Sequence, residues 1–82
     1  MTSSPERTTE QRIQAAITRA LGIKSPDSSV PLRMGSTPGW DSMGHMSVVM
    51  ELEKEFNTRF PPYRLPELVD VASIARTLQT PA

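Results

Sequence analysis

Apolar residues recur at helical spacing in three stretches of the chain. In the first stretch they follow one another at i, i+3, i+4, i+7 and i+8, at Ile13, Ala16, Ile17, Ala20 and Leu21. This spacing predicts an amphipathic helix. Thr8 and Gln11 form a capping-box pattern at its start, and Gly22 is placed to end it in the left-handed conformation.

The second stretch carries two apolar stripes on one predicted helix, which begins at Asp41 or Ser42 and runs to about Asn57. Asp41 is a good N-cap residue. At about 100° per residue, the broad face expected to join the core holds His45, Val48, Val49, Leu52 and Phe56. The nearly opposite side holds Met43, Met46 and Met50. Either a bundle buries both stripes, or the flexible methionines face solvent as a docking site for partners.

The third stretch lies near the C-terminus, where helical spacing joins Val71, Ile74, Ala75 and Leu78. Asp70 is a plausible N-cap for this helix, and Pro81 ends it. Pro61 and Pro62 stop the preceding helix, and a short turn or helix is expected from Tyr63 to Leu68. The chain shows no strand alternation. The pattern therefore predicts an all-α fold with three main helices and a short third helix between the second and the last.

A long loop separates the first two helices. Residues 23–40 contain three prolines and two glycines, and loops of this length in small domains are usually functional or disordered. We expect some of its apolar side chains to hold it against the core, with Trp40 as the anchor at its end; the others are Val30, Leu32 and Met34. Residues 1–7 are predicted to be a flexible tail, residues 8–79 the folded domain, and residues 80–82 a C-terminal tail.

Composition narrows the function classes. The 82 residues include no cysteine and one histidine, so neither disulfides nor a metal site is expected. Nine basic residues balance nine acidic ones, which argues against nucleic-acid binding. No apolar run approaches the length of a membrane span, and the N-terminus lacks the apolar core of a signal peptide. The expectation is a cytoplasmic monomer that binds neither membrane nor nucleic acid.

Ser42 is the candidate for chemistry. At the first turn of a helix, free N–H groups and the helix dipole would stabilise a phosphate attached to its hydroxyl, and Gly44 is expected to leave room beside it. Serine is also a common helix cap, so its position alone does not distinguish a modified serine from one that only caps the helix. A catalytic pair with His45 is conceivable, but the helical angle directs His45 to the core edge, and the Gly-x-Ser-x-Gly elbow of hydrolases is missing. His45 is expected to be structural.

The wider pattern resembles a known family. Gly39-Trp40-Asp41-Ser42-Met43 is similar to the Gly-x-Asp-Ser-Leu signature of acyl and peptidyl carrier proteins, which bind phosphopantetheine. Residues 46–56 are similar to that family's second helix, with its Leu-Glu-x-x-Phe ending. Residues 31–33 resemble its loop anchor, and residues 70–74 the start of its last helix. The resemblance extends from about Thr8 to Leu78.

The resemblance implies a small four-helix bundle of the acyl carrier type that is not itself an enzyme. A phosphopantetheinyl transferase would attach 4'-phosphopantetheine from coenzyme A to Ser42, between Asp41 and Met43. The thiol of that arm would hold an acyl or aminoacyl group as a thioester and present it to loading, condensing or tailoring enzymes. Met43 and Met46 match apolar docking positions of the family, and Met50 is a further candidate.

The chain also departs from the family. Met43 replaces leucine, and acidic residues appear on the second helix only from Glu51 onward. A weakly charged docking face predicts dedicated partners and mainly apolar contacts. The Trp-Asp-Ser form resembles free-standing carriers of specialised polyketide or nonribosomal peptide pathways, although a fatty acyl cargo stays open. Glu51, Glu53 and Glu55, with Lys54, are expected to form a solvated face. The alternative function is an unmodified helical interaction module that binds a partner through its methionines.

Overall fold

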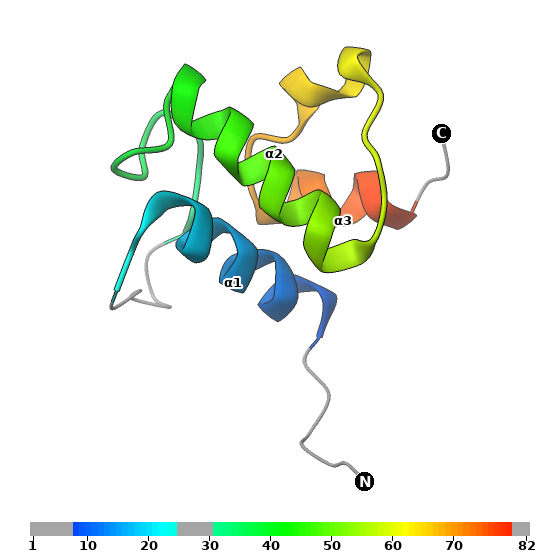
Figure 1. Ribbon diagram of the computed structural model, residues 1–82, viewed down its shortest axis with the longest axis horizontal. Helices are drawn as coiled ribbons and strands as arrows, with labels where there is room; N and C mark the ends of the chain where they lie inside the picture. The colour runs from blue at the N-terminus through cyan, green and yellow to red at the C-terminus, as the bar shows by residue number, and fades with distance from the viewer. Residues whose placement is uncertain (1–7, 25–30, 80–82) are drawn as a thin grey trace, which may run out of the picture.

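A computed structural model describes residues 8–24 and 31–79 and shows an all-helical chain there (Figure 1). The elements in order are α1 (Thr9–Leu21), α2 (Ser42–Phe56), the 3₁₀ helix η1 (Pro62–Glu67) and α3 (Val71–Gln79). Extended pairing within these residues is limited to one isolated bridge between Arg33 and Asp70. The predicted helical class and element order are confirmed. Val30 and the predicted tails, 1–7 and 80–82, lie outside the described residues.

The ends of α1 follow the predicted capping pattern. The Thr8 Oγ1 atom accepts a hydrogen bond from the Gln11 N–H at 3.0 Å, and Gln11 Oε1 accepts one from the Thr8 N–H at 2.9 Å. Gly22 ends the helix in the left-handed region, with φ 71°. The reciprocal side-chain bonds satisfy two amide groups that the first turn leaves without helical partners.

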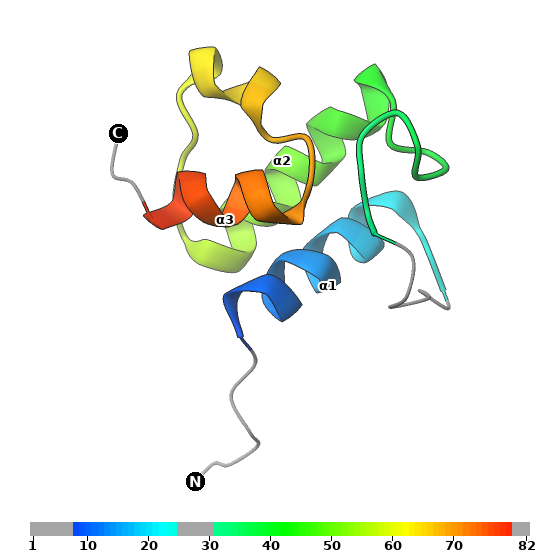
Figure 2. The same ribbon diagram turned by 180° about the vertical axis from the view of Figure 1, so that it is seen from behind.

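The long helix α2 also begins and ends where the sequence predicts. Asp41 Oδ1 accepts a hydrogen bond of 2.9 Å from the Gly44 N–H, which makes Asp41 the N-cap. Asn57, with φ 51°, ends the helix in the left-handed region. Figures 1 and 2 show α1 on one side of α2 and η1 on the opposite side. The last helix, α3, packs chiefly against α1.

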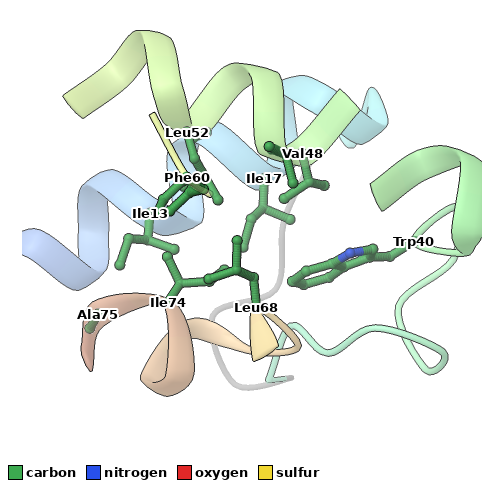
Figure 3. Close-up of a cluster of buried hydrophobic side chains, with 11 residues drawn as sticks. Ile13, Ile17, Trp40, Val48, Leu52, Phe60, Leu68, Ile74 and Ala75 are labelled. Carbon is green, nitrogen blue, oxygen red and sulfur yellow. The ribbon is translucent and has the colours of Figure 1, made fainter. Parts of the chain in front are cut away.

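The core lies between α1, α2 and α3 and receives side chains from both connecting segments (Figure 3). Trp40 comes from the loop before α2, and its side chain is 1% exposed, so its predicted role as an anchor is confirmed. Leu68, just after η1, is fully buried. The other largest fully buried side chains are Ile13, Ile17, Val48, Leu52 and Ile74. Burial of these apolar side chains is the main stabilising contribution to a domain that has no disulfides.

Ion pairs join α1 to the second half of α2. Arg12 Nε lies 2.9 Å from Glu55 Oε2, its Nη2 donates to the Glu55 carbonyl oxygen at 2.8 Å, and its guanidinium carbon stands 4.4 Å from the centre of the Phe56 ring. Arg19 lies 3.2 Å from both Glu51 and Glu55. The hydrogen bond from Arg12 is the main cause that lowers the pKa of Glu55 below its usual 4.5.

These contacts correct the prediction of a solvated acidic face. Glu51 and Glu55 are half-buried and paired with α1, and Glu53 Oε2 accepts a hydrogen bond of 2.9 Å from the Phe60 N–H. The prediction was wrong because the arginines of α1 lie more than thirty residues away in the chain. Periodicity within one helix does not reveal such partners.

A compact capping arrangement begins α3. Asp70 Oδ1 accepts from the Ser73 N–H at 2.8 Å, and Ser73 Oγ accepts from the N–H groups of Val69 and Asp70 at 3.0 Å. Arg33 Nη1 lies 3.1 Å from Asp70 Oδ2 and joins the long loop to this cap. The hydrogen bonds from Ser73, the backbone one first, lower the pKa of Asp70 below its usual 3.8.

Candidate functional site

Ser42 is the first residue of α2, and it is exposed. The two residues before Ser42 fix the backbone where the loop enters α2. Trp40 is buried in the core, and the Asp41 carboxylate caps the helix. The serine therefore stands on a chain segment whose direction is determined by an apolar anchor and a helix cap, while the residue itself remains exposed.

The first turn of α2 offers amide groups to an anion. The Gly44 N–H donates to Asp41 Oδ1, and the His45 N–H donates to the Asp41 carbonyl oxygen at 2.8 Å. Among the described residues, the N–H groups of Ser42 and Met43 have no acceptor. No acidic side chain lies within the first turn itself. Free amide groups and the positive end of the helix dipole favour negative charge at this position.

Gly44 has a different role from the one expected. A Cβ atom on this residue would overlap the carbonyl oxygen of Gly39 and stand 3.3 Å from Leu21 Cδ2. The missing side chain therefore lets the loop pack against α2, rather than leaving space beside Ser42. The expectation was wrong because the loop folds back over the helix, which the sequence pattern does not show.

The methionine stripe faces solvent. Met43, Met46 and Met50 are exposed by 84%, 52% and 60%. The opposite face buries His45, Val48, Val49 and Leu52, with Phe56 half-buried. Of the two alternatives that the sequence left open, the exposed stripe is confirmed and the fully buried helix is excluded. The stripe begins beside Ser42 and continues along α2.

His45 is buried and uses both ring nitrogens. Trp40 Nε1 donates to His45 Nδ1 at 2.9 Å, and His45 Nε2 lies 2.9 Å from the carbonyl oxygen of Leu65. The predicted structural role is confirmed. A base for Ser42 would need a free nitrogen directed at the hydroxyl, and His45 has neither. The sequence placed His45 at the core edge but offered no signal for its partner on η1.

Within residues 8–24 and 31–79, no group of three or more His, Cys, Asp and Glu side chains is arranged to hold a metal ion. None of the helices in that part of the chain has the length and apolar character needed to cross a bilayer. Ser42, Asp41 and the methionine stripe lie at the start of α2 and along its exposed face.

Comparison with known proteins identifies the family. The chain is 30% identical over 70 residues to an acyl carrier protein of Rickettsia bellii (strain OSU 85-389). The match covers 85% of this chain and 86% of that protein. No protein-family model and no solved structure matches the chain. A relationship of this extent, over a helical chain of the same size class, shows that the chain belongs to the acyl carrier protein family.

Proposed function

We propose that this protein carries acyl or aminoacyl groups on a 4'-phosphopantetheine arm attached to Ser42. The single observation that carries the proposal is the exposure of Ser42 at the first residue of α2, within a chain of the acyl carrier protein family. A transferase needs access to this hydroxyl from outside. The buried Trp40 and the capping Asp41 hold the backbone from which it projects.

The residues around Ser42 fit a phosphodiester. The free N–H groups of Ser42 and Met43 and the dipole of α2 would stabilise its negative charge. Asp41 would position the serine through the helix cap, and the exposed Met43 would flank the first atoms of the arm. When bound, 4'-phosphopantetheine derived from coenzyme A supplies a thiol that holds the cargo as a thioester.

The protein itself would not be the catalyst. His45, the nearest candidate base, is committed to Trp40 and Leu65. We therefore assign the chemistry to partners: a phosphopantetheinyl transferase, and enzymes that load, condense or tailor the cargo. Fatty acyl, polyketide and aminoacyl cargoes all fit the proposal, and a specialised polyketide or nonribosomal peptide pathway is the setting we favour.

The proposed docking surface is the stripe of Met43, Met46 and Met50. The carboxylates of α2 contribute little free charge to it, because Glu51 and Glu55 pair with arginines of α1 and Glu53 binds the Phe60 N–H. Partners would therefore recognise the helix chiefly through apolar contact, with Asp41 as the exposed charge nearest the serine. Salt screens attraction between charges and leaves apolar contact largely unaffected. Binding of partners to the methionine stripe should therefore depend only weakly on salt concentration.

A second function is supported by the same exposed methionines. In this alternative the chain is an unmodified interaction module, and the stripe binds a protein partner without any arm on Ser42. The two functions differ in their response to substitution. Ser42→Ala abolishes activity of a carrier but leaves an interaction module intact, whereas Met46→Glu damages either one.

Incubation with coenzyme A and a broad-specificity phosphopantetheinyl transferase tests the primary proposal. The wild type should gain the mass of one phosphopantetheine, and the Ser42→Ala variant should gain none. A folded wild type that gains no mass with two different transferases would favour the interaction module.

A further inference from the structure

The two hydrogen bonds of His45 determine which of its ring nitrogens carries the hydrogen. The indole N–H of Trp40 can only donate, so His45 Nδ1 must be the acceptor at 2.9 Å. The carbonyl oxygen of Leu65 can only accept, so His45 Nε2 must carry the hydrogen at 2.9 Å. The ring is 7% exposed and nearly parallel to the indole, with 22° between the two planes. The geometry therefore requires a neutral imidazole in the Nε2–H tautomer.

This imidazole joins three segments that meet near the serine. Trp40 belongs to the loop two residues before Ser42, and His45 lies on α2 three residues after it. Leu65 lies on η1, twenty residues further along the chain. A hydrogen bond from each nitrogen thus ties the loop and η1 to the same turn of α2.

Packing holds segment η1 only in part: Leu65 is half-buried against the core, and Phe60 and Leu68 are buried on either side of the segment. None of its six residues is buried, and it contains Pro66, which has no N–H to donate. Its Arg64–Glu67 ion pair, at 3.4 Å, lies within the segment and does not join it to another helix. Because no residue within η1 is fully buried, the hydrogen bond from His45 to Leu65 adds a specific contact that keeps the segment closed against α2.

We propose that His45 is a positioning residue, whose Trp40–His45–Leu65 bridge holds the serine loop and η1 as one rigid surface for the transferase. This inference rests on the proposed function of Ser42. A preformed surface avoids the entropy cost of ordering the loop and η1 when the transferase binds. Loss of the bridge should therefore raise KM for this protein as a substrate, with less effect on kcat.

Three substitutions separate the two halves of the bridge. In His45→Asn the amide oxygen replaces Nδ1 and can still accept from Trp40. In His45→Gln the amide nitrogen replaces Nε2 and can still donate to the Leu65 carbonyl. His45→Phe keeps an aromatic ring of similar size and removes both bonds. Ser47→Ala, an exposed position on the same helix, is the matched control.

The first readout is amide hydrogen exchange of the unmodified chain. The reporters are the N–H groups of Arg64 and Leu68, which donate to Pro61 and Leu65, and the Trp40 N–H, which donates to Thr37. His45→Phe should accelerate exchange at all three by about tenfold, the equivalent of one net buried hydrogen bond. His45→Gln should restore protection at Arg64 and Leu68, and His45→Asn at Trp40. Imidazole ¹⁵N shifts of the wild type should report the Nε2–H tautomer.

The second readout is steady-state transfer of phosphopantetheine. His45→Phe should raise KM by about fivefold, which is less than the effect on exchange because transferase binding can restore part of the lost order, with kcat within about twofold of the wild type. If His45→Phe does not fold, Trp40→Phe carries the same test, because it removes the indole donor and keeps the aromatic bulk.

Three results would overturn the proposal. These are an Nδ1–H tautomer, folded variants with unchanged exchange at the reporter amides, or faster exchange with an unchanged KM, which would leave His45 a purely structural role. If the wild type accepts no phosphopantetheine, the proposed function fails. The exchange and tautomer measurements still decide whether the bridge exists, since they use the unmodified chain.

Discussion

The carbonyl oxygen of Gly39 occupies the space that a side chain on Gly44 would need. The contact brings the end of the long loop against the first turn of α2, which Ser42 begins. Gly39 itself has φ 87°, a backbone conformation that favours glycine. Two glycines thus position the segment that presents the serine, one through its conformation and the other through its missing side chain.

Gly44→Ala should destabilise the protein even though alanine favours helices. Helix propensity alone would stabilise the variant by about 1 kcal/mol. Overlap with the Gly39 carbonyl should cost more than that, about 2–3 kcal/mol, because the obstacle is backbone on one side and Leu21 on the other. Thermal unfolding should show a lower Tm for Gly44→Ala and an unchanged or higher one for Ser47→Ala. A Tm for Gly44→Ala above that of the wild type would refute the close contact.

Met46→Asp should weaken docking without weakening the fold. Met46 is half exposed, so the charge meets solvent in the free protein and an apolar surface in the complex. We expect about a tenfold loss of kcat/KM with the transferase, typical of a central interface residue, and a Tm near that of the wild type. Ser47→Asp places the same charge on the neighbouring exposed position and should have a smaller effect. Equal losses from both variants would indicate a general charge effect rather than apolar docking.

Acid should destabilise the fold through two carboxylates. The folded-state pKa values of Asp70 and Glu55 lie below their usual 3.8 and 4.5, so each ionised group stabilises the folded protein. Both contributions are complete well above pH 4.5 and diminish as the pH falls through 4.5 and 3.8. They vanish below the lowered pKa values. Tm measured from pH 7 to pH 3 should therefore fall most steeply below about pH 5.

Asp70→Asn provides the control for this titration. Asparagine can still cap α3 but cannot ionise, so part of the acid dependence should disappear while the helix remains. A variant with the same Tm profile as the wild type between pH 5 and pH 3 would show that Asp70 does not contribute to it.

Local sequence signals predicted the helices well. Thr8, Gly22 and Asp41 mark helix ends through contacts that span only a few residues. Both partners of each capping contact can therefore be read from a short stretch of sequence. The core face of α2 also follows from spacing alone. Helix periodicity was sufficient to show that the methionines lie opposite that face, and the structure then decided between burial and exposure.

Local sequence signals did not predict the contacts between segments that are distant in the chain. The Arg12–Glu55 pair, the Gly39–Gly44 contact and the His45–Leu65 hydrogen bond each depend on how the loop and the helices pack. η1 has no periodic apolar pattern, so nothing in the sequence marks Leu65 as a partner of His45. The position of Ser42 at the start of α2 was predicted, but the contacts that hold the preceding loop against the helix appear only in three dimensions.

Intact-mass measurement after treatment with coenzyme A and a phosphopantetheinyl transferase tests the central claim most directly. We expect one added phosphopantetheine on the wild type and on Ser47→Ala, none on Ser42→Ala, and a modified peptide that contains Ser42. A folded wild type that remains unmodified with two transferases, or a Ser42→Ala variant that still gains the group, would contradict it.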